Sequence, residues 1–492
     1  MSVKLAELGN RYADEDTARV VEIDVSGGRK EMTHRQLHEL VRARADQLAA
    51  AGVGEGHVIG LRARNSIDWV SWDLAALMVG AVIKAFPDAQ ELPDAGEFLA
   101  HHGLALLITD DPPPGVPAVI APDGTPGPAV VPDSATRVVG EDLHSLVYSS
   151  GTTGRLKGLQ ISAKGTEYVI ALFIEHFKVT SADRHLIFLP LSNYQQRLSV
   201  YCCLWLGADL VLAPYQRVFN AVRDTRPTFL IGPPVFYETL LQLYRKTGGG
   251  SLPDFLGGAV RFLITGMAPI RRATLDAYWA EGVSLLEAYG LTETGMVAWN
   301  TPDAHRNGTV GRLIDPSAVI FRPDGELVID RPAPLSSGYF DHDDQAADVF
   351  LPDGGIATGD YGDLDEDGFL TLAGRKKDVI ALGSGRKVHP ARIESAFTGI
   401  EGVAEFVVVP TPQSGRLGAI VTPAAPDDAA LTKRIRAAVD EVNRGLEASE
   451  RVMSLVFSAS PLGSDQRFLT ANLKLSRIRA AEYFAEAVGH GG

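Results

Sequence analysis

Apolar residues recur along the chain with two alternating periods, one typical of helices and one typical of strands. Between Thr33 and Ala51 they lie three or four residues apart, which predicts an amphipathic helix with Thr33 as its N-cap. The run HVIGLRAR predicts a strand, and the run IDWVSWDLAALMVGAVIKAF predicts a helix. Strand and helix patterns keep alternating through LALLITD, LHSLVYSS, EYVIALFIEHF, HLIFLP and ADLVLA. This alternation predicts an α/β fold with largely parallel sheets.

The pattern of predicted strands and helices changes along the chain, and these changes indicate where the chain is divided into domains. Residues 111–138 are rich in proline and glycine and predict a surface excursion. Over residues 308–376 short strands with Asp-Gly turns, VIFRPDGELVID and DLDEDGFLTLAG, predict a small β-rich subdomain. A shorter α/β segment follows, with the strand AEFVVVP and the helix AALTKRIRAAVDEVNRGL. We therefore expect a large N-terminal domain, residues 1–376, and a small C-terminal domain, residues 377–492.

The composition is that of a globular protein, because 45% of the 492 residues are apolar and 22% are charged. Acidic residues outnumber basic residues by 61 to 46, and the net charge of −15 disfavours nucleic acid or an anionic membrane as a partner. No apolar run reaches the roughly 20 residues that span a bilayer, so we expect a cytoplasmic protein without stable membrane insertion. Cys202 and Cys203 lie in an apolar run and are expected to be buried thiols, not parts of a disulfide or zinc site.

The first segment whose residues could form a functional site is SSGTTGRLKG, residues 149–158. Backbone N–H groups, hydroxyls and one lysine around a tight glycine-rich loop can wrap a polyphosphate, because these donors and the cation offset its negative charge. The order of residues differs from that of a Walker A loop. The same composition also occurs in ordinary surface turns, so this segment alone leaves both interpretations open.

Two further segments each hold one carboxylate in a glycine-bounded turn. In YGLTETG, residues 289–295, Glu293 stands between two threonines, a set suited to Mg²⁺ on phosphate oxygens. Alternatively, Thr292 could cap a helix. In TGDYG, Asp360 can accept the two hydroxyls of a ribose, although a solvated hairpin turn would have the same composition. The run GRKKD that follows adds Arg375 and further basic residues.

In this order and at these separations, the segments resemble those of the adenylate-forming (ANL) superfamily of AMP-dependent synthetases and ligases, which includes acyl-CoA synthetases, nonribosomal adenylation domains and luciferases. The resemblance covers residues 10–485, and the ending LTANLKLSR completes it. The segments LPL, GMAP and this ending are most similar to the long-chain acyl-CoA synthetase branch. The resemblance implies ATP and Mg²⁺ as cofactors, a small-molecule acid and CoA as substrates, and a mobile C-terminal domain.

The resemblance also implies roles for individual residues. The β- and γ-phosphates would be held by Ser149, Ser150, Gly151, Thr152, Thr153, Gly154 and Lys157. The adenine would be flanked by Gly266, Ala268, Pro269, Tyr289 and Gly290. The α-phosphate, Mg²⁺ and the ribose would be contacted by Thr292, Glu293 and Asp360, respectively, with Arg375 beside the ribose. The remaining roles fall to Arg386, which reaches the phosphates during adenylation, to Lys377 at the hinge, and to Lys474, which approaches the carboxylate and the α-phosphate.

One segment departs from the superfamily pattern. Long-chain relatives usually have histidine and glutamate where this chain has Asn193 and Gln196, in LPLSNYQQR. In the superfamily this segment lies between the acid pocket and the thiol tunnel, so we expect Asn193, Tyr194, Arg197 and Met267 at the acid pocket. Its walls are expected from around Tyr194–Arg197, Phe229–Tyr237 and the turn after Thr294. The departure leaves Arg197 without its carboxylate, unless Gln196 and backbone carbonyls solvate it. It indicates an acid smaller or more polar than an unbranched long-chain fatty acid, or an acceptor other than free CoA.

Three functional hypotheses follow. The first is an AMP-forming acid–CoA ligase, in which acid, ATP and CoA give acyl-CoA, AMP and pyrophosphate. The second keeps the adenylation but activates an unusual small acid, including nitrite in diazo formation, or transfers to a carrier-protein thiol or an amine. The third, a non-catalytic nucleotide-binding protein, is disfavoured because every charged position of the pattern is present. No general base is needed, since a carboxylate is ionised near neutral pH, whereas Lys474 and Mg²⁺ would offset the repulsion between two anions.

Overall fold

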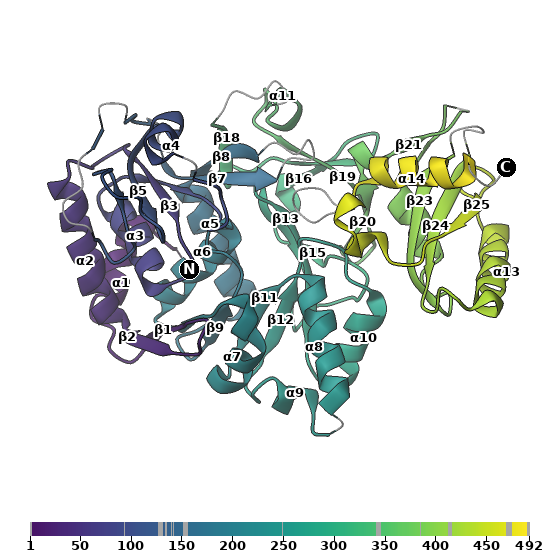
Figure 1. Cartoon of the computed structure of the whole chain (residues 1–492), viewed down its shortest axis with the longest axis horizontal. Coiled ribbons are helices and arrows are strands. Elements are labelled where there is room, and N and C mark those ends of the chain that lie inside the picture. The colour runs from purple at the N-terminus through teal and green to yellow at the C-terminus, as the bar shows by residue number, and fades with distance from the viewer. Residues whose placement is uncertain are drawn as a thin grey trace.

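Two large sheets with helices between them organise most of the molecule, and a smaller unit holds the C-terminal part of the chain (Figure 1). The computed structural model describes residues 2–92, 94–125, 131–132, 135–138, 140, 142–150, 156–247, 249–340, 346–383, 385–411, 416–468 and 475–489. The predicted α/β architecture, with a larger N-terminal part and a smaller C-terminal part, is confirmed.

The largest sheet within the described residues runs in the order β15-β14-β13-β12-β11-β9-β10-β1-β2. Its central strands β13, β12, β11, β9, β10 and β1 are parallel, and the pairs at both edges are antiparallel. The bounds of these strands are β1 Arg19–Ile23, β2 Arg29–Thr33, β9 Arg184–Ile187, β10 Asp209–Leu212, β11 Phe229–Gly232, β12 Phe262–Thr265, β13 Leu285–Leu291, β14 Gly295–Trp299 and β15 Arg312–Leu313.

The second sheet has the order β18-β8-β7-β4-β3-β5-β6 in the part of the chain that is described. Its strands are β3 Val58–Arg62, β4 Val82–Ala85, β5 Leu104–Thr109, β6 Val119–Ile120, β7 Leu143–Ser150, β8 Leu156–Ser162 and β18 Ser336–Tyr339. The helices α3, α5 and α6 and the inner faces of both sheets contribute to one apolar cluster, which includes Trp69, Phe177, Cys202 and Cys203. Both cysteines are buried, as predicted.

Short antiparallel strands follow, as the Asp-Gly turns predict. The sheet β16-β17-β19-β20 consists of Val319–Phe321, Glu326–Ile329, Ile356–Leu364 and Leu370–Arg375. Beyond it, β21 Ile380–Ala381 pairs with β22 Lys387–Val388. The C-terminal part has the sheet β23-β24-β25, formed by Val403–Pro410, Leu417–Pro423 and Val452–Phe457.

The helices of the chain have the bounds α1 Leu8–Tyr12, α2 His34–Ala50, α3 Ile67–Met78, α4 Ala95–His102, α5 Ala163–Phe177, α6 Tyr194–Leu206, α7 Val218–Thr225, α8 Pro234–Thr247, α9 Leu252–Phe255, α10 Arg272–Ala280, α11 Ala346–Val349, α12 Pro390–Ala396, α13 Ala429–Gly445 and α14 Arg477–Gly489. Thr33 caps α2 as predicted, and it forms a reciprocal capping box with Gln36. The helix predicted to reach Phe86 is wrong at its end. It stops at Met78, Gly80 adopts a positive φ of 71°, and the apolar run that follows is strand β4.

Candidate functional site

Two of the predicted segments leave neighbouring strands at the same edge of the large sheet. Strands β12 and β13 pair in parallel, so the turn GMAP (266–269) lies beside the residues that lead into YGLTETG. A Cβ added at Gly266 would lie only 3.1 Å from the carbonyl oxygen of Ala288. Met267 has a positive φ of 71°, which is uncommon for a residue with a side chain. The carboxyl edge of parallel strands is where ligands bind in open α/β sheets.

Tyr289, Asp360 and Arg375 meet beside this edge. The Tyr289 hydroxyl donates to Asp360 Oδ2 at 2.7 Å, and Arg375 Nε lies 3.0 Å from Asp360 Oδ1. Asp360 and Arg375 are register partners in the β19–β20 ladder, which fixes the position of the ion pair. Asp360 is buried within strand β19, so the alternative of a solvated hairpin turn is wrong for this residue. Each carboxylate oxygen has two lone pairs, so Asp360 can still accept further hydrogen bonds.

The YGLTETG segment forms the hairpin between β13 and β14, so Thr292 does not cap a helix. At Gly290 an added Cβ would lie 2.5 Å from the carbonyl oxygen of Gly295, so the two strands approach too closely for a side chain. Sequence reasoning missed Arg331, a buried guanidinium that donates to the carbonyl oxygens of Thr294 at 3.1 Å and Met296 at 2.6 Å. A lone arginine that follows the apolar strand β17 was its only signal.

The carboxylate of Glu293 faces the edge of the second sheet. It is half-buried, and Tyr339 on β18 donates its hydroxyl to Glu293 Oε1 at 3.4 Å. Strand β18 pairs with β8, and β8 pairs with β7 through Ser149 opposite Lys157 and Ser150 opposite Leu156. The backbones that flank the predicted phosphate loop therefore belong to the sheet that Glu293 faces. The predicted loop residues Gly151, Thr152, Thr153 and Gly154 lie outside the described residues.

The predicted C-terminal residues lie on different elements. Lys377 belongs to the short 3-10 helix Lys376–Asp378 that follows β20. Its neighbour Lys376 is anchored to Glu326 on β17, with 2.7 Å between Nζ and Oε2. Arg386 is exposed between β21 and β22 and forms an ion pair with Glu447. Lys474 lies outside the described residues.

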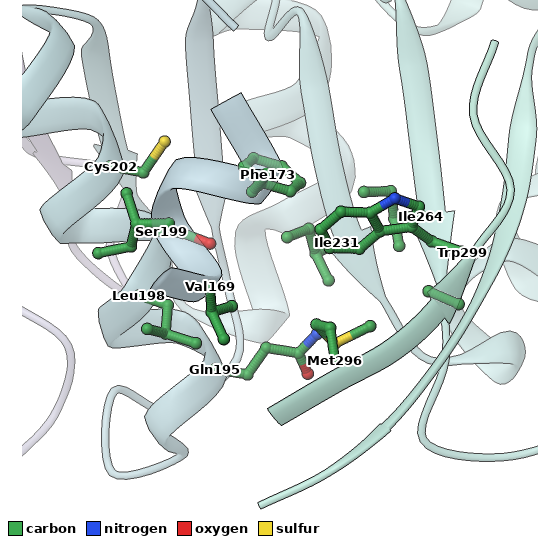
Figure 2. Close-up of a pocket in the computed structure, with 12 residues that line it drawn as sticks. Val169, Phe173, Gln195, Leu198, Ser199, Cys202, Ile231, Ile264, Met296 and Trp299 are labelled. Atoms are coloured by element: carbon green, nitrogen blue, oxygen red, sulfur yellow. The ribbon is translucent and has the colours of Figure 1, made fainter. Parts of the chain in front are cut away.

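An apolar pocket begins beside the β13–β14 hairpin (Figure 2). It has an empty volume of about 460 Å³ between α5, α6 and the strands of the large sheet. Ala288 and Met296, which border it, flank the hairpin that carries Glu293. The other lining residues are Val169, Ile170, Phe173, Gln195, Leu198, Ser199, Cys202, Ile231, Ile264 and Trp299.

The four residues predicted for the acid pocket are not among those that line this cavity. Asn193 is exposed at the N-cap of α6, where its side chain accepts a hydrogen bond from Gln195 N. Tyr194 is buried, and its hydroxyl bonds to His144 Nε2 at 2.7 Å. Met267 is 40% exposed. The pocket is instead lined by the next positions of the same helix, because successive residues of a helix point about 100° apart.

The expectation that Arg197 lacks a carboxylate partner is wrong. Its guanidinium is fully buried and pairs with Asp73 on α3, with 2.5 Å between Nη2 and Oδ1. Arg197 also donates to the hydroxyl oxygens of Ser145 at 2.5 Å and Tyr201 at 3.0 Å. Asp73 lies 124 positions earlier in the chain, so its pairing with Arg197 depends on tertiary packing. Arg197 therefore belongs to the buried framework behind the pocket.

The described residues offer no group of three or more His, Cys, Asp or Glu side chains that could hold a metal ion by themselves. Within the same part of the chain, no helix combines the length and the apolar character required to cross a bilayer. A metal at Glu293 would therefore take most of its ligands from elsewhere.

Comparisons with known proteins agree with this architecture. Residues 9–340 match the model of the AMP-binding enzyme family, and residues 377–490 match that of the AMP-binding enzyme C-terminal domain. The chain is 27% identical to the long-chain-fatty-acid–CoA ligase FadD13 of Mycobacterium tuberculosis, across 77% of this chain and 80% of that protein. It is 28% identical to a feruloyl-CoA synthase of Amycolatopsis sp., across 87% of this chain and 92% of that protein.

Solved structures show the same fold. ATP-bound MatB from Rhodopseudomonas palustris superposes with a TM-score of 0.78 at 23% identity, across 99% of both chains. The family model covers more than half of the chain, and its match includes the β13–β14 hairpin and the strands that flank the predicted phosphate loop. The chain therefore belongs to the AMP-binding enzyme family.

Proposed function

We propose that the protein is an AMP-forming acid–CoA ligase. In the first step a carboxylate oxygen of the acid attacks the α-phosphorus of ATP, the acyl–phosphate bond forms, and pyrophosphate leaves. In the second step the sulfur of CoA bonds to the acyl carbon and the bond to the AMP oxygen breaks. AMP departs with that oxygen, and the thiol proton passes to solvent. These two steps convert an unreactive carboxylate into a thioester at the expense of ATP.

One observation carries the proposal: the β13–β14 hairpin borders both the cluster of Tyr289, Asp360 and Arg375 and the apolar pocket. Tyr289 of this hairpin donates to Asp360, and Met296 at its other end lines the pocket. A nucleotide with its ribose on Asp360 and an acid with its tail in the pocket would therefore meet beside Thr292 and Glu293. Such placement turns a reaction of two separate molecules into one within a single complex.

The residues suit the charges of this reaction. Asp360 would accept the ribose hydroxyls, with Arg375 holding its other face. The loop from Ser149 to Lys157 would surround the β- and γ-phosphates with N–H groups and hydroxyls. Lys474 would stand beside the carboxylate and the α-phosphate, where a cation offsets the repulsion between two anions.

Mg²⁺ fits the donor set at Glu293. Mg²⁺ is usually held by one or two carboxylates, with substrate phosphates and water completing its octahedron. Glu293 supplies one half-buried carboxylate, and the described residues around it form no closed cage that would displace those other ligands. When bound, the ion would neutralise phosphate charge and polarise the bond to the departing pyrophosphate.

The second step requires Lys474 to leave and a thiol to enter, which a rotation of the C-terminal domain would achieve. Lys376 is tied to Glu326 in the larger part of the molecule. The chain is therefore anchored up to this residue, and the rotation would begin at Lys377. Arg386 now pairs with Glu447 of its own domain and would exchange this partner for phosphate oxygens during adenylation.

The test is ATP–pyrophosphate exchange over a panel of aromatic, branched, fatty and inorganic acids, followed by detection of thioester with CoA. We expect exchange that depends on the acid and thioester that depends on CoA. Exchange without thioester would point to a carrier-protein thiol or an amine as acceptor. The absence of exchange with every acid, alongside measurable ATP binding, would favour a non-catalytic protein and overturn the proposal.

A further inference from the structure

The apolar pocket contains two polar side-chain groups that the fold does not use. Gln195 and Ser199 lie one turn apart on α6 and both line the pocket. Among the described residues, neither side chain has a hydrogen-bond partner, although Ser199 is only 4% exposed. Figure 2 shows the Ser199 hydroxyl turned into the pocket. The Ser199 oxygen stays accessible from the pocket, so a group on a bound ligand can exchange a hydrogen bond with it.

The direction of α6 sets the depth of these two groups. Helix α6 connects the parallel strands β9 and β10, so it runs from the carboxyl edge of the sheet back to the amino edge. The carboxyl edge is also where the GMAP and YGLTETG segments begin. Gln195, in the first turn of α6, therefore lies nearer to the predicted nucleotide site at Tyr289 and Asp360. Ser199 lies about 6 Å further along the helix axis, inside the pocket.

Aromatic side chains close the deep end. Phe173 on α5 packs against Phe177, Phe229 and Trp299, with 6.1 Å between the ring centroids of Phe173 and Trp299. The indole N–H of Trp299 donates to His176 Nδ1 at 2.8 Å, so it is not available to a ligand. Aromatic walls of this kind pack well against the face or edge of a ring on the ligand.

The charge of the walls restricts the ligand further. The lining contains no Lys, Arg, His, Asp or Glu within the described part of the chain. A second carboxylate or an ammonium group on the tail would be desolvated there without a counter-ion, which is strongly unfavourable. A hydroxyl or keto group can bond to the Gln195 amide or the Ser199 hydroxyl, because each of these groups both donates and accepts.

We propose that the acid is a compact, ring-containing acid with a neutral hydroxyl or keto substituent, and that Ser199 and Gln195 select it by hydrogen bonding to that substituent. This inference rests on the proposed function and adds the substrate class to it. Ser199 forms a hydrogen bond with a substituent inside the pocket, and Gln195 forms one with a substituent nearer to the carboxylate. Aliphatic and aromatic walls hold the ring by burial of its apolar surface.

The experiment compares pairs of acids that differ by one hydroxyl: benzoate with 3- and 4-hydroxybenzoate, and 3-phenylpropanoate with its 3- and 4-hydroxyphenyl analogues. Octanoate and palmitate test the size limit. Acid-dependent ATP–pyrophosphate exchange gives kcat/KM for the wild type, Ser199→Ala and Gln195→Met. Ser181→Ala and Gln242→Met make the same substitutions at exposed positions outside the pocket and serve as controls.

We expect the wild type to prefer a hydroxylated acid over its parent and over palmitate. Ser199→Ala or Gln195→Met should lower kcat/KM for that acid by about 10-fold while leaving the parent acid nearly unchanged, because one hydrogen bond is lost. A general folding defect would lower both acids of a pair equally. Such parallel loss, or a wild-type preference for the parent acids or palmitate, would overturn the inference while the ligase activity stands. A wild type that activates no acid would overturn the proposed function as well.

Discussion

The Tyr289 hydroxyl donates to Asp360 Oδ2 at 2.7 Å and thereby joins the β13–β14 hairpin to strand β19. Burial raises the pKa of Tyr289 well above its ordinary value, and the neighbouring Asp360 carboxylate raises it further. The hydroxyl therefore stays protonated and keeps donating across the working pH range. This bond, together with the Arg375 ion pair, holds the carboxylate in one orientation before a nucleotide binds.

Asp360→Asn should weaken ATP binding by about 10-fold or more, because charge-assisted hydrogen bonds to ribose hydroxyls are replaced by weaker neutral ones. Asp360→Ala should weaken it further and also lower the melting temperature, since the buried Tyr289 hydroxyl loses its acceptor. Calorimetric ATP titration and thermal unfolding measure the two effects. Asp363→Asn, exposed on the same strand, is the control. Unchanged ATP affinity in Asp360→Asn, with lowered stability, would show that the carboxylate is structural only.

Lys474→Ala should reduce adenylation by roughly 100- to 1,000-fold, the usual effect of removing one preorganised electrostatic donor. Thioester formation from supplied acyl-adenylate should be comparatively intact, because in the proposed role the cation would offset charge only while the carboxylate attacks ATP. Pyrophosphate exchange and single-turnover thioester formation measure the two steps separately. Equal loss in both steps would contradict the role given to Lys474.

The sequence predicted the fold class, the capped helix α2 and several strands, including β3, β5 and β23, because these depend on local periodicity. The end of α3 was missed because the mainly apolar segment from Ile67 to Phe86 continues through Gly80 into β4, and apolar content alone does not separate a buried helix from a buried strand. Of the ranges expected at the acid pocket, Gln195, Ile231 and Met296 line the cavity, whereas Asn193, Tyr194, Arg197 and Met267 do not. Whether Tyr194 or Gln195 faces the cavity depends on how α6 packs against α5 and the sheet.

The sequence did not predict contacts between side chains that are far apart along the chain. Nothing local connects Arg197 with Asp73, although their pairing explains how a fully buried guanidinium is tolerated. The same holds for Arg331, which donates to carbonyl oxygens of a hairpin 37 and 35 positions earlier. Backbone acceptors leave no trace in the residue types of a motif.

Asp73→Asn should lower the free energy of unfolding by about 3–5 kcal/mol, because removal of one partner leaves the buried Arg197 charge uncompensated. Replacing both residues, as in Asp73→Leu with Arg197→Met, should restore part of that loss. Urea unfolding measures each variant, and Asp46→Asn on the exposed face of α2 is the control. A double variant no more stable than Asp73→Asn alone would contradict this account of the pair.

Gln196→Met should stabilise the protein by about 1–2 kcal/mol. The Gln196 side chain is fully buried, and neither of its amide atoms has a hydrogen-bond partner among the described residues. A methionine of similar length removes two unsatisfied polar atoms while filling the same space. Gln242→Met, at an exposed site on α8, should change stability little. Destabilisation by Gln196→Met would show that the amide is satisfied, for example by a bound water.

Glu287→Gln should stabilise the protein at pH 8 and change little at pH 4.5. Burial raises the pKa of the Glu287 carboxyl from 4.5 to about 7, against the opposing effects of the Gly308 N–H and Arg272. A carboxyl with a raised pKa binds its proton more tightly in the folded state, so the free energy of unfolding falls as pH rises from 4.5 towards 7 and stays low above it. The full difference corresponds to roughly 3 kcal/mol.

A glutamine is neutral at every pH and can still accept from the Gly308 N–H, which lies 3.0 Å from Glu287 Oε2. The variant should therefore lose the part of the pH dependence that lies between 4.5 and 7, and its melting temperature should exceed that of the wild type only on the alkaline side. Thermal unfolding at half-unit steps from pH 4.5 to 8.5 measures this, with Glu366→Gln at an exposed position as control. Two melting curves that stay parallel over the whole range would mean that Glu287 ionises normally in the folded protein, since only a raised pKa makes the benefit of the substitution grow with pH.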